Sequence, residues 1–181
     1  DLLEELVIPE GITTIKSYTF YNCRSITSVT LCGTITRINA YAFTGCTELT
    51  GINITDISHW LQIQFNSAES NPLYEYNNLY LNGNLLTDVV VPDSITAIQN
   101  HAFVNCYSIQ SVTLGDGVES VGTGAFTNCK NLTNFTFGNG IKTIQANMFS
   151  GCTNLTTVVL SDSVETIGEY AFSTCKNLEE I

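Results

Sequence analysis

Positive charge is scarce in this sequence: six Lys and Arg stand against seventeen Asp and Glu, and the formal net charge is −11. Nucleic acid is therefore not the expected partner, because phosphate binding needs a basic stripe that this composition does not supply. The same balance disfavours docking on an anionic membrane surface. No apolar run approaches the roughly 18 residues of a membrane-spanning helix, so we expect no membrane insertion in this segment.

Aromatic residues, although only 10% of the chain, mark a regular repeat. The step from Phe20 to Phe43 is twenty-three positions, and the same step separates Phe103, Phe126, Phe149 and Phe172 from one another. Self-similarity at a fixed period is the signature of a solenoid. With 181 residues, of which 44% are hydrophobic, the chain predicts a single domain with one continuous core.

Each repeat carries the same apolar template around its phenylalanine. A cysteine follows at the third position and an Ile or Leu at the sixth, as in Phe126, Cys129 and Leu132. Two apolar residues in alternation, such as Val112 and Leu114, indicate a short strand with alternate side chains pointing inward. One strand per coil predicts a parallel sheet of seven complete strands, and stacking buries the face that a single coil cannot bury alone.

One interval breaks the period, because Phe43 and Phe103 lie sixty positions apart, which is two periods plus fourteen further positions. Tyr80 is assigned to the phenylalanine position of the intervening repeat, with Leu86, Val89 and Val91 following at the expected spacings. We therefore expect an insertion within about residues 56–78 that projects from one face. It contains the only tryptophan, Trp60.

The repeated template resembles the BspA-like class of leucine-rich repeats. The motif that carries the resemblance is Ile-x-x-Ile-x-x-x-Ala-Phe-x-x-Cys-x-x-Leu-x-x-Val-x-Leu, and it covers essentially the whole chain. The resemblance implies an α/β-type repeat solenoid: a right-handed coil with a parallel β-sheet on the concave face and short helical or 3-10 turns on the convex face. It also implies an extracellular or cell-surface protein that adheres to host or neighbouring-cell macromolecules, such as host extracellular matrix.

The two ends of the sequence have the same phase within the repeat. Leu3-Glu4-Glu5-Leu6 corresponds to Leu178-Glu179-Glu180-Ile181, and neither resembles the polar capping repeat that solenoids need. We therefore expect residues 1–181 to be one solenoid segment of a longer protein, with any signal peptide or anchor outside it.

Catalytic and metal-binding patterns are weak. The two histidines, His59 and His101, fall in different repeats, and paired carboxylates at catalytic spacing do not stand out. Six of the seven cysteines share one repeat position and lack the close Cys-x-x-Cys spacing of zinc sites, which favours small buried side chains. Cys32 is the exception, and it is interpreted either as an exposed reactive thiol or as a partly covered bystander. We expect no enzyme activity and no cofactor.

Sequons occur at Asn53, Asn131, Asn134 and Asn154. They would be glycosylated only in a eukaryotic secretory route, and the alternative is that they arise by chance in a chain this rich in Asn and Thr.

The predicted concave face is the first candidate binding surface. Its outward side chains are polar and nearly uncharged, which suits a protein or peptide ligand, although they could also form a merely soluble sheet surface. The candidate residues on this face are Ser28, Thr30, Asn53, Asp88, Ser111, Thr113, Asn134 and Thr136.

The insertion is the second candidate surface, because it gathers Trp60, Tyr74 and Tyr76, and Trp and Tyr are enriched at binding hot spots. In this hypothesis, Asn53 and Asp88 form the edge of the site. The alternative is that Trp60 and Phe65 extend the core. The sequence thus predicts a non-catalytic binding or adhesion module, with a passive spacer or stalk as the alternative.

Overall fold

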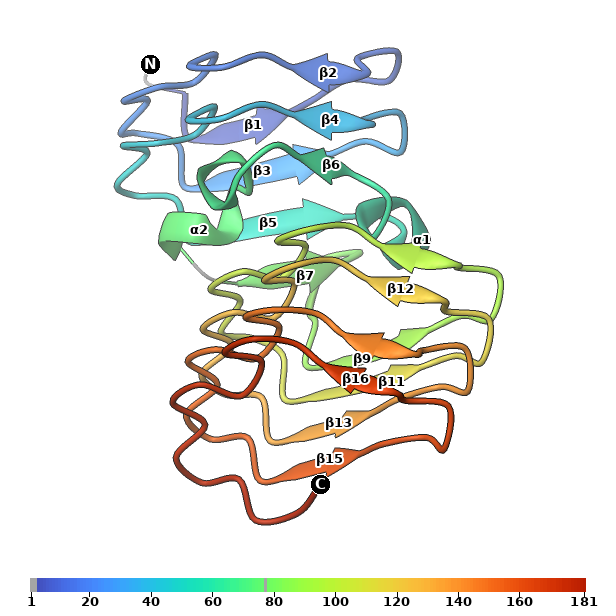
Figure 1. The fold of residues 1–181 in the computed structure, drawn as a ribbon. Helices are drawn as coiled ribbons and strands as arrows, with labels where there is room; N and C mark the ends of the chain where they lie inside the picture. Colours follow the sequence, from blue (N-terminus) through green and yellow to red (C-terminus); the bar gives the residue numbers. More distant parts are fainter. Residues whose placement is uncertain (1–2, 77) are drawn as a thin grey trace.

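The protein is a solenoid of stacked coils with a parallel sheet along one side, as Figure 1 shows for the computed structural model, which describes residues 3–76 and 78–181. We call this side the main sheet face. Its first ladder contains β1 (Glu5–Val7), β3 (Ser28–Leu31), β5 (Gly51–Ile54) and β7 (Leu79–Leu81). Its second ladder contains β9 (Asp88–Val91), β11 (Ser111–Leu114), β13 (Asn134–Thr136) and β15 (Thr157–Val159).

A second set of short strands lies on the other side of the coils, which we call the second face. Three of its strands pair in one ladder: β2 (Thr14–Ile15), β4 (Arg37–Ile38) and β6 (Gln64–Phe65). The others form two pairs: β10 (Ala97–Ile98) with β12 (Ser120–Val121), and β14 (Thr143–Ile144) with β16 (Thr166–Ile167). Turns complete each coil. In these turns a backbone N–H donates to the carbonyl three residues earlier, as the Cys106 N–H does to the Phe103 carbonyl. The predicted solenoid class is confirmed.

The constant period of the repeat sets the register of the strand ladders. Val29 pairs with Ile52 across β3 and β5, and Val112 pairs with Phe135 across β11 and β13. Equivalent side chains therefore stack in columns, and the inward residues of the strands are buried in one continuous core. Each coil contributes one layer to that core, as expected for a solenoid whose coils contact only their neighbours.

The phenylalanine and cysteine columns run side by side through the core. The rings of Phe103 and Phe126 stack with centroids 5.1 Å apart. The Cys129 thiol donates to the carbonyl of Phe103 in the preceding coil at 3.0 Å, and Cys152 does the same to Phe126 at 3.1 Å. Cys106, Cys129 and Cys152 are all fully buried, so their predicted inward placement is confirmed. Burial also raises the pKa of the Cys129 thiol.

The thiols of Cys46, Cys129, Cys152 and Cys175 each donate to a backbone carbonyl of the coil before, which gives the cysteine column a structural role. The Cys106 thiol instead lies 3.4 Å from the Ser108 hydroxyl. Cys32 lies outside that column and is 9% exposed. Its thiol donates to the Pro9 carbonyl at 3.1 Å and lies 3.1 Å from the Thr34 hydroxyl. This placement favours the covered bystander over the reactive thiol.

The irregular coil differs from its predicted form. Ile52 pairs with Leu79, twenty-seven positions later, and the next equivalent strand residue, Val89, follows after only ten more. The fourteen additional positions are thus divided: four lengthen the coil after β5, and the step of ten from Leu79 to Val89 holds the hairpin of β7 with β8 (Asn84–Leu85) and its connection to β9. Tyr80 belongs to β7 and not to a phenylalanine position, which corrects the sequence assignment. The seven expected main-sheet strands become eight parallel strands in the described residues.

The lengthened coil contains the helical elements of the structure. They are α1 (Ile57–Trp60), the 3-10 helix η1 (Ala68–Ser70) and α2 (Leu73–Tyr76). The side chain of Asp56 caps α1 by accepting from the Ser58 N–H at 2.8 Å. Within the described residues, no helix has the length and apolar character to cross a bilayer.

Replacing Phe126 by Ala should destabilise the fold by about 3–5 kcal/mol, as for other large truncations in protein cores. The ring is fully buried and contacts Phe103, Phe135 and Phe149. Denaturant melts of the two proteins measure this difference. A loss below about 1 kcal/mol would show that the phenylalanine column does not form the core.

Candidate functional site

The main sheet face presents the predicted row of polar side chains. In β3, β11 and β13 the outward residues are partly or fully exposed, and they alternate with buried Val, Leu and Phe. The outward residues from the predicted set are Ser28, Thr30, Ser111, Thr113, Asn134 and Thr136. Ladder pairing places Ser111 beside Asn134 and Thr113 beside Thr136. The face therefore offers hydroxyl and amide groups in regular rows.

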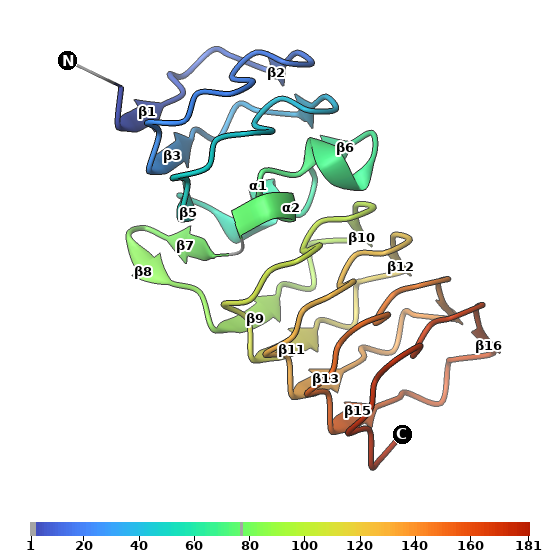
Figure 2. The same cartoon turned by 90° about the vertical axis from the view of Figure 1, so that its left-hand side faces the viewer.

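Tyr80 lies in the middle of this face, where the sequence predicted no aromatic residue. A Cβ atom added to Gly51 would approach the Tyr80 ring to 2.5 Å, so the ring covers the position where Gly51 has no side chain. Its antiparallel partner is Leu85, which is 47% exposed, and directly opposed residues project on the same face of a sheet. Figure 2 shows the β7–β8 hairpin where the row of main-sheet strands is interrupted.

Asn53 and Asp88 lie on either side of this hairpin, on β5 and β9. The Asn53 side-chain oxygen accepts from the Gly83 N–H at 2.8 Å, which ties the hairpin turn to β5. The Asp88 carboxylate accepts from the hydroxyls of Ser111 and Thr87, and these bonds lower its pKa. Both residues therefore orient neighbouring groups at the centre of the face.

Trp60 does not form the exposed contact that one hypothesis assigned to it, and this assignment is corrected. Its side chain is fully buried, and its indole N–H donates to the Ala102 carbonyl at 3.1 Å. Phe65 packs against it with ring centroids 5.5 Å apart. The alternative, in which both residues extend the core, is the one that this packing supports.

Asn71 joins the lengthened coil to the next regular coil. Its amide group donates to the carbonyls of His101 and Ala102 at 2.8 and 2.9 Å, and its oxygen accepts from the Leu73 N–H at 2.8 Å. The Asn71 side chain is 2% exposed. On the second face, the Gln99 N–H donates to the Leu61 carbonyl at 3.1 Å. These contacts connect the coils before the predicted insertion to the coils after it, and we therefore call the insertion a joint between two stacks of coils.

The remaining residues proposed for the insertion are only partly placed on its surface. Tyr74 is 37% exposed, and its carbonyl accepts from the Asn105 side chain. The side chain of Tyr76 lies outside the described part of the structure. The insertion therefore does not gather the three aromatic side chains into one exposed cluster.

The two histidines lie apart in different environments. A ring nitrogen of His59 lies 2.6 Å from the Ile35 carbonyl. His101 is half-buried, and burial lowers its pKa while nearby Glu69 opposes that shift. Across residues 3–76 and 78–181, no group of three or more His, Cys, Asp or Glu side chains is arranged to hold a metal ion.

Comparison with known families identifies the repeat family of these coils. The model of the BspA type leucine rich repeat region matches six copies, over residues 2–75 and 73–181. This chain belongs to the BspA-type leucine-rich repeat family. Proteins of this repeat type are typical non-catalytic interaction scaffolds. A search of curated proteins returned no match to the sequence.

Solved bacterial leucine-rich repeat structures share the fold. A T. pallidum leucine rich repeat protein has 25% identity and a TM-score of 0.67, with coverage of 98% of this chain and 79% of its own. A Bacteroides ovatus leucine-rich repeat protein has 28% identity and a TM-score of 0.59, and the match covers 97% of this chain and 47% of that protein. A Faecalibacterium prausnitzii leucine rich cell surface protein has 27% identity and a TM-score of 0.54, and the match covers 99% of this chain and 59% of that protein. The chain thus spans about half the length of the last two proteins.

Replacing Asn71 by Leu should destabilise the BspA-type solenoid by about 1–3 kcal/mol, because the buried Leu73 N–H loses its acceptor. Asn66→Leu is the matched control: Asn66 lies in the same coil, is exposed, and should change stability by less than about 0.5 kcal/mol. Thermal and denaturant melts compare the two variants. Equal stability of both variants would contradict the role of Asn71 as a joint.

Proposed function

We propose that this segment is an extracellular protein-binding module whose contact surface is the main sheet face, centred on the β7–β8 hairpin. The observation that carries the proposal is the Tyr80 ring lying across Gly51 beside exposed Leu85. Aromatic anchors near the centre of an interface commonly supply much of its binding energy. The surrounding Ser, Thr and Asn side chains suit the polar rim of such an interface.

The scarcity of charge on this face favours a protein or peptide ligand. Among the outward residues of its described parallel strands, the charged ones are Glu5 on β1 and Asp88 on β9. Asp88 is held by two hydroxyl groups, so the face presents hydrogen-bonding groups in fixed positions. Such preorganised groups cost less conformational entropy on binding than mobile ones.

Extracellular location and adhesion to host or neighbouring-cell macromolecules belong to the same proposal. One structural relative is described as a leucine rich cell surface protein of Faecalibacterium prausnitzii. Membership of the same repeat family extends this location to the present chain as a hypothesis. Host extracellular matrix proteins are the partners that we propose to test first.

A passive spacer is the second candidate function. The first and last strands of the main sheet face, β1 and β15, lie at opposite ends of the solenoid in Figures 1 and 2, and this elongated shape suits a spacer. A spacer has no use for the partly exposed Tyr80 ring beside Leu85, whereas a binding module would use both as contacts. The hairpin therefore distinguishes the two functions.

The test measures binding to a panel of purified extracellular matrix proteins by biolayer interferometry. For any protein that binds, Tyr80→Ser with Leu85→Ser should weaken the affinity at least about tenfold, which corresponds to about 1.4 kcal/mol. The control is Tyr170→Asn, which removes a 68% exposed ring from the turns between the two faces. Its φ of 57° matches that of Asn147 one coil earlier, so the backbone should tolerate the change.

Unchanged affinity in the Tyr80 and Leu85 double variant would exclude the hairpin as the centre of the site. A larger loss in the Tyr170 variant would move the contact surface to the turns. Absence of binding to every protein of the panel would favour the spacer.

A further inference from the structure

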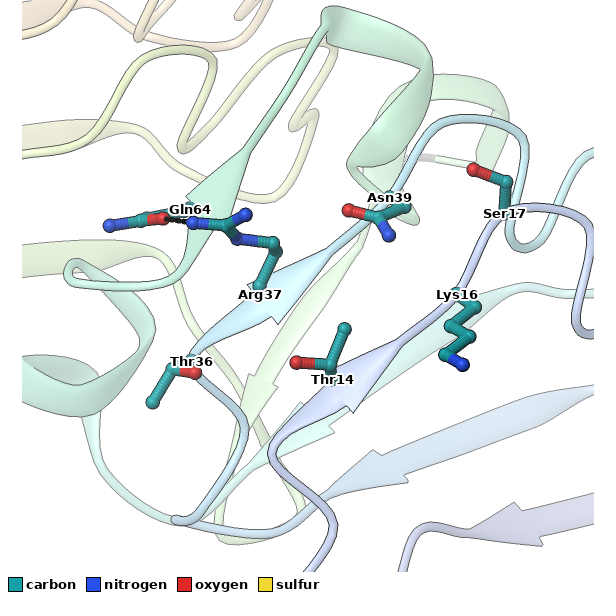
Figure 3. Close-up of a pocket in the computed structure, with 7 residues that line it drawn as sticks. All are labelled: Thr14, Lys16, Ser17, Thr36, Arg37, Asn39 and Gln64. Atoms are coloured by element: carbon teal, nitrogen blue, oxygen red, sulfur yellow. Dashed lines mark hydrogen bonds between the residues drawn. The ribbon is translucent and has the colours of Figure 1, made fainter.

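An open groove of about 690 Å³ lies on the second face, across β2, β4 and β6. This volume falls within the range of about 300–1,000 Å³ that is typical of small-ligand sites. Figure 3 shows its lining side chains, which come from three successive coils: Thr14, Lys16, Ser17, Thr36, Arg37, Asn39 and Gln64. The groove is thus built from the outward side chains of the second strand ladder.

The groove is positively charged within a strongly acidic chain. Lys16 and Arg37 line it, and no carboxylate is among the residues that line it. A second groove of similar size, about 620 Å³, is lined by Lys142 together with Asp116 and Glu119. A lining that contains cations and no carboxylate therefore distinguishes the first groove from the second.

Neighbouring side chains hold the polar groups of the first groove in place. The Arg37 guanidinium donates to the Gln64 side-chain oxygen, and Figure 3 shows the two groups against each other. The Asn66 amide donates to the Asn39 side-chain oxygen at 2.9 Å, which leaves the Asn39 N–H groups as donors. The groove therefore offers donors from ammonium, guanidinium, amide and hydroxyl groups, which suit acceptor-rich ligands.

Three exposed tyrosines follow the groove residues in the chain. Tyr18 comes directly after Ser17, and Tyr41 comes two positions after Asn39. The Tyr18 ring stacks on Tyr41 with centroids 5.4 Å apart and meets Tyr21 edge-on at 5.6 Å. Their side chains are 57%, 40% and 49% exposed in the order Tyr18, Tyr41, Tyr21.

The backbone at two of these tyrosines adopts a conformation that bulky residues rarely take. Tyr18 and Tyr41 have φ values of 63° and 64°, and the residues at the same repeat position in later coils, His101, Gly124, Asn147 and Tyr170, also have positive φ. The left-handed backbone is therefore a property of the repeat. Tyr18 and Tyr41 differ from the later coils in presenting two exposed rings that stack on each other.

We propose that this groove and the adjoining tyrosines bind an anionic oligosaccharide. Its sulfate or carboxylate groups pair with Lys16 and Arg37, its hydroxyls accept from the amides and threonines, and its ring faces lie on the tyrosines. The seven lining residues include no large apolar side chain, so the groove lacks the pockets that would select the side chains of an acidic peptide. The site is separate from the main sheet face and does not depend on the function proposed there.

Calorimetric titrations with defined ligands test this site. The probes are a sulfated glycosaminoglycan hexasaccharide, its desulfated form that keeps the carboxylates, inorganic sulfate, and a polyglutamate peptide of matched charge. The wild-type chain should bind at least one of the two hexasaccharides more tightly than it binds sulfate or polyglutamate. Comparison of the two hexasaccharides identifies which anionic group is recognised.

Two variants and one control separate charge from stacking. Lys16→Ala with Arg37→Ala should weaken hexasaccharide binding at least about tenfold, and Tyr18→Asn with Tyr41→Asn should weaken it at least about threefold. Lys142→Ala, in the mixed-charge groove, should leave binding unchanged. Thermal melts verify that each variant is folded, and the Asn replacements suit the backbone as Asn147 does.

Three results would overturn the proposal. They are absence of binding to both hexasaccharides, equal binding by the wild type and the Lys16 and Arg37 double variant, and equal or tighter binding of polyglutamate. The last result would assign the groove to acidic peptides.

Discussion

The structure depends on one constraint: a single coil cannot bury its own apolar face and must be covered by its neighbours. A constant period meets this requirement because it repeats the strand ladder, the phenylalanine stack and the cysteine column in the same register. The hydrogen bond from the Cys129 thiol to the Phe103 carbonyl joins adjacent coils. The stacked rings of Phe103 and Phe126 join the same two coils. A change of register at any coil must therefore be compensated by other contacts between the same layers.

The lengthened coil supplies that compensation and, in doing so, creates the distinctive surface of the molecule. Trp60 and Asn71 bind the Ala102 carbonyl, and Leu61 accepts from Gln99 where a regular ladder would otherwise continue. On the main sheet face, the surplus residues form the β7–β8 hairpin with Tyr80 on its outer side. The proposed protein contact is therefore located where the packing of regular coils is interrupted.

The sequence predicted buried positions well because periodicity reports on residues that repeat in the core. The phenylalanine spacing located the coils, and the alternation around Val112 located a strand and its outward residues. The placement of Tyr80 failed because Leu86, Val89 and Val91 follow it at the spacings of the regular template. Those spacings correctly predict the residues that lead into β9 and its inward side chains. They do not predict the hairpin that precedes β9.

Exposed features were harder to predict, since they repeat less strictly than the core. Tyr18 and Tyr41 share a repeat position with Gly124 and Asn147, and this mixture of residues indicates a left-handed backbone more than a binding surface. Trp60 was a candidate for an exposed contact because hot spots are rich in tryptophan. Its buried position follows from the need to fill the layer that the lengthened coil leaves between two stacks.

Hydrogen–deuterium exchange of residues 57–73 is the most direct test of the claim that the irregular coil is a core joint. The amides of Trp60, Leu61 and Ile63 donate to backbone carbonyls within this coil. The account predicts that these amides exchange as slowly as those around Phe126 in a regular coil, because both require the opening of stacked layers. Exchange within seconds, as in a mobile surface loop, would contradict it.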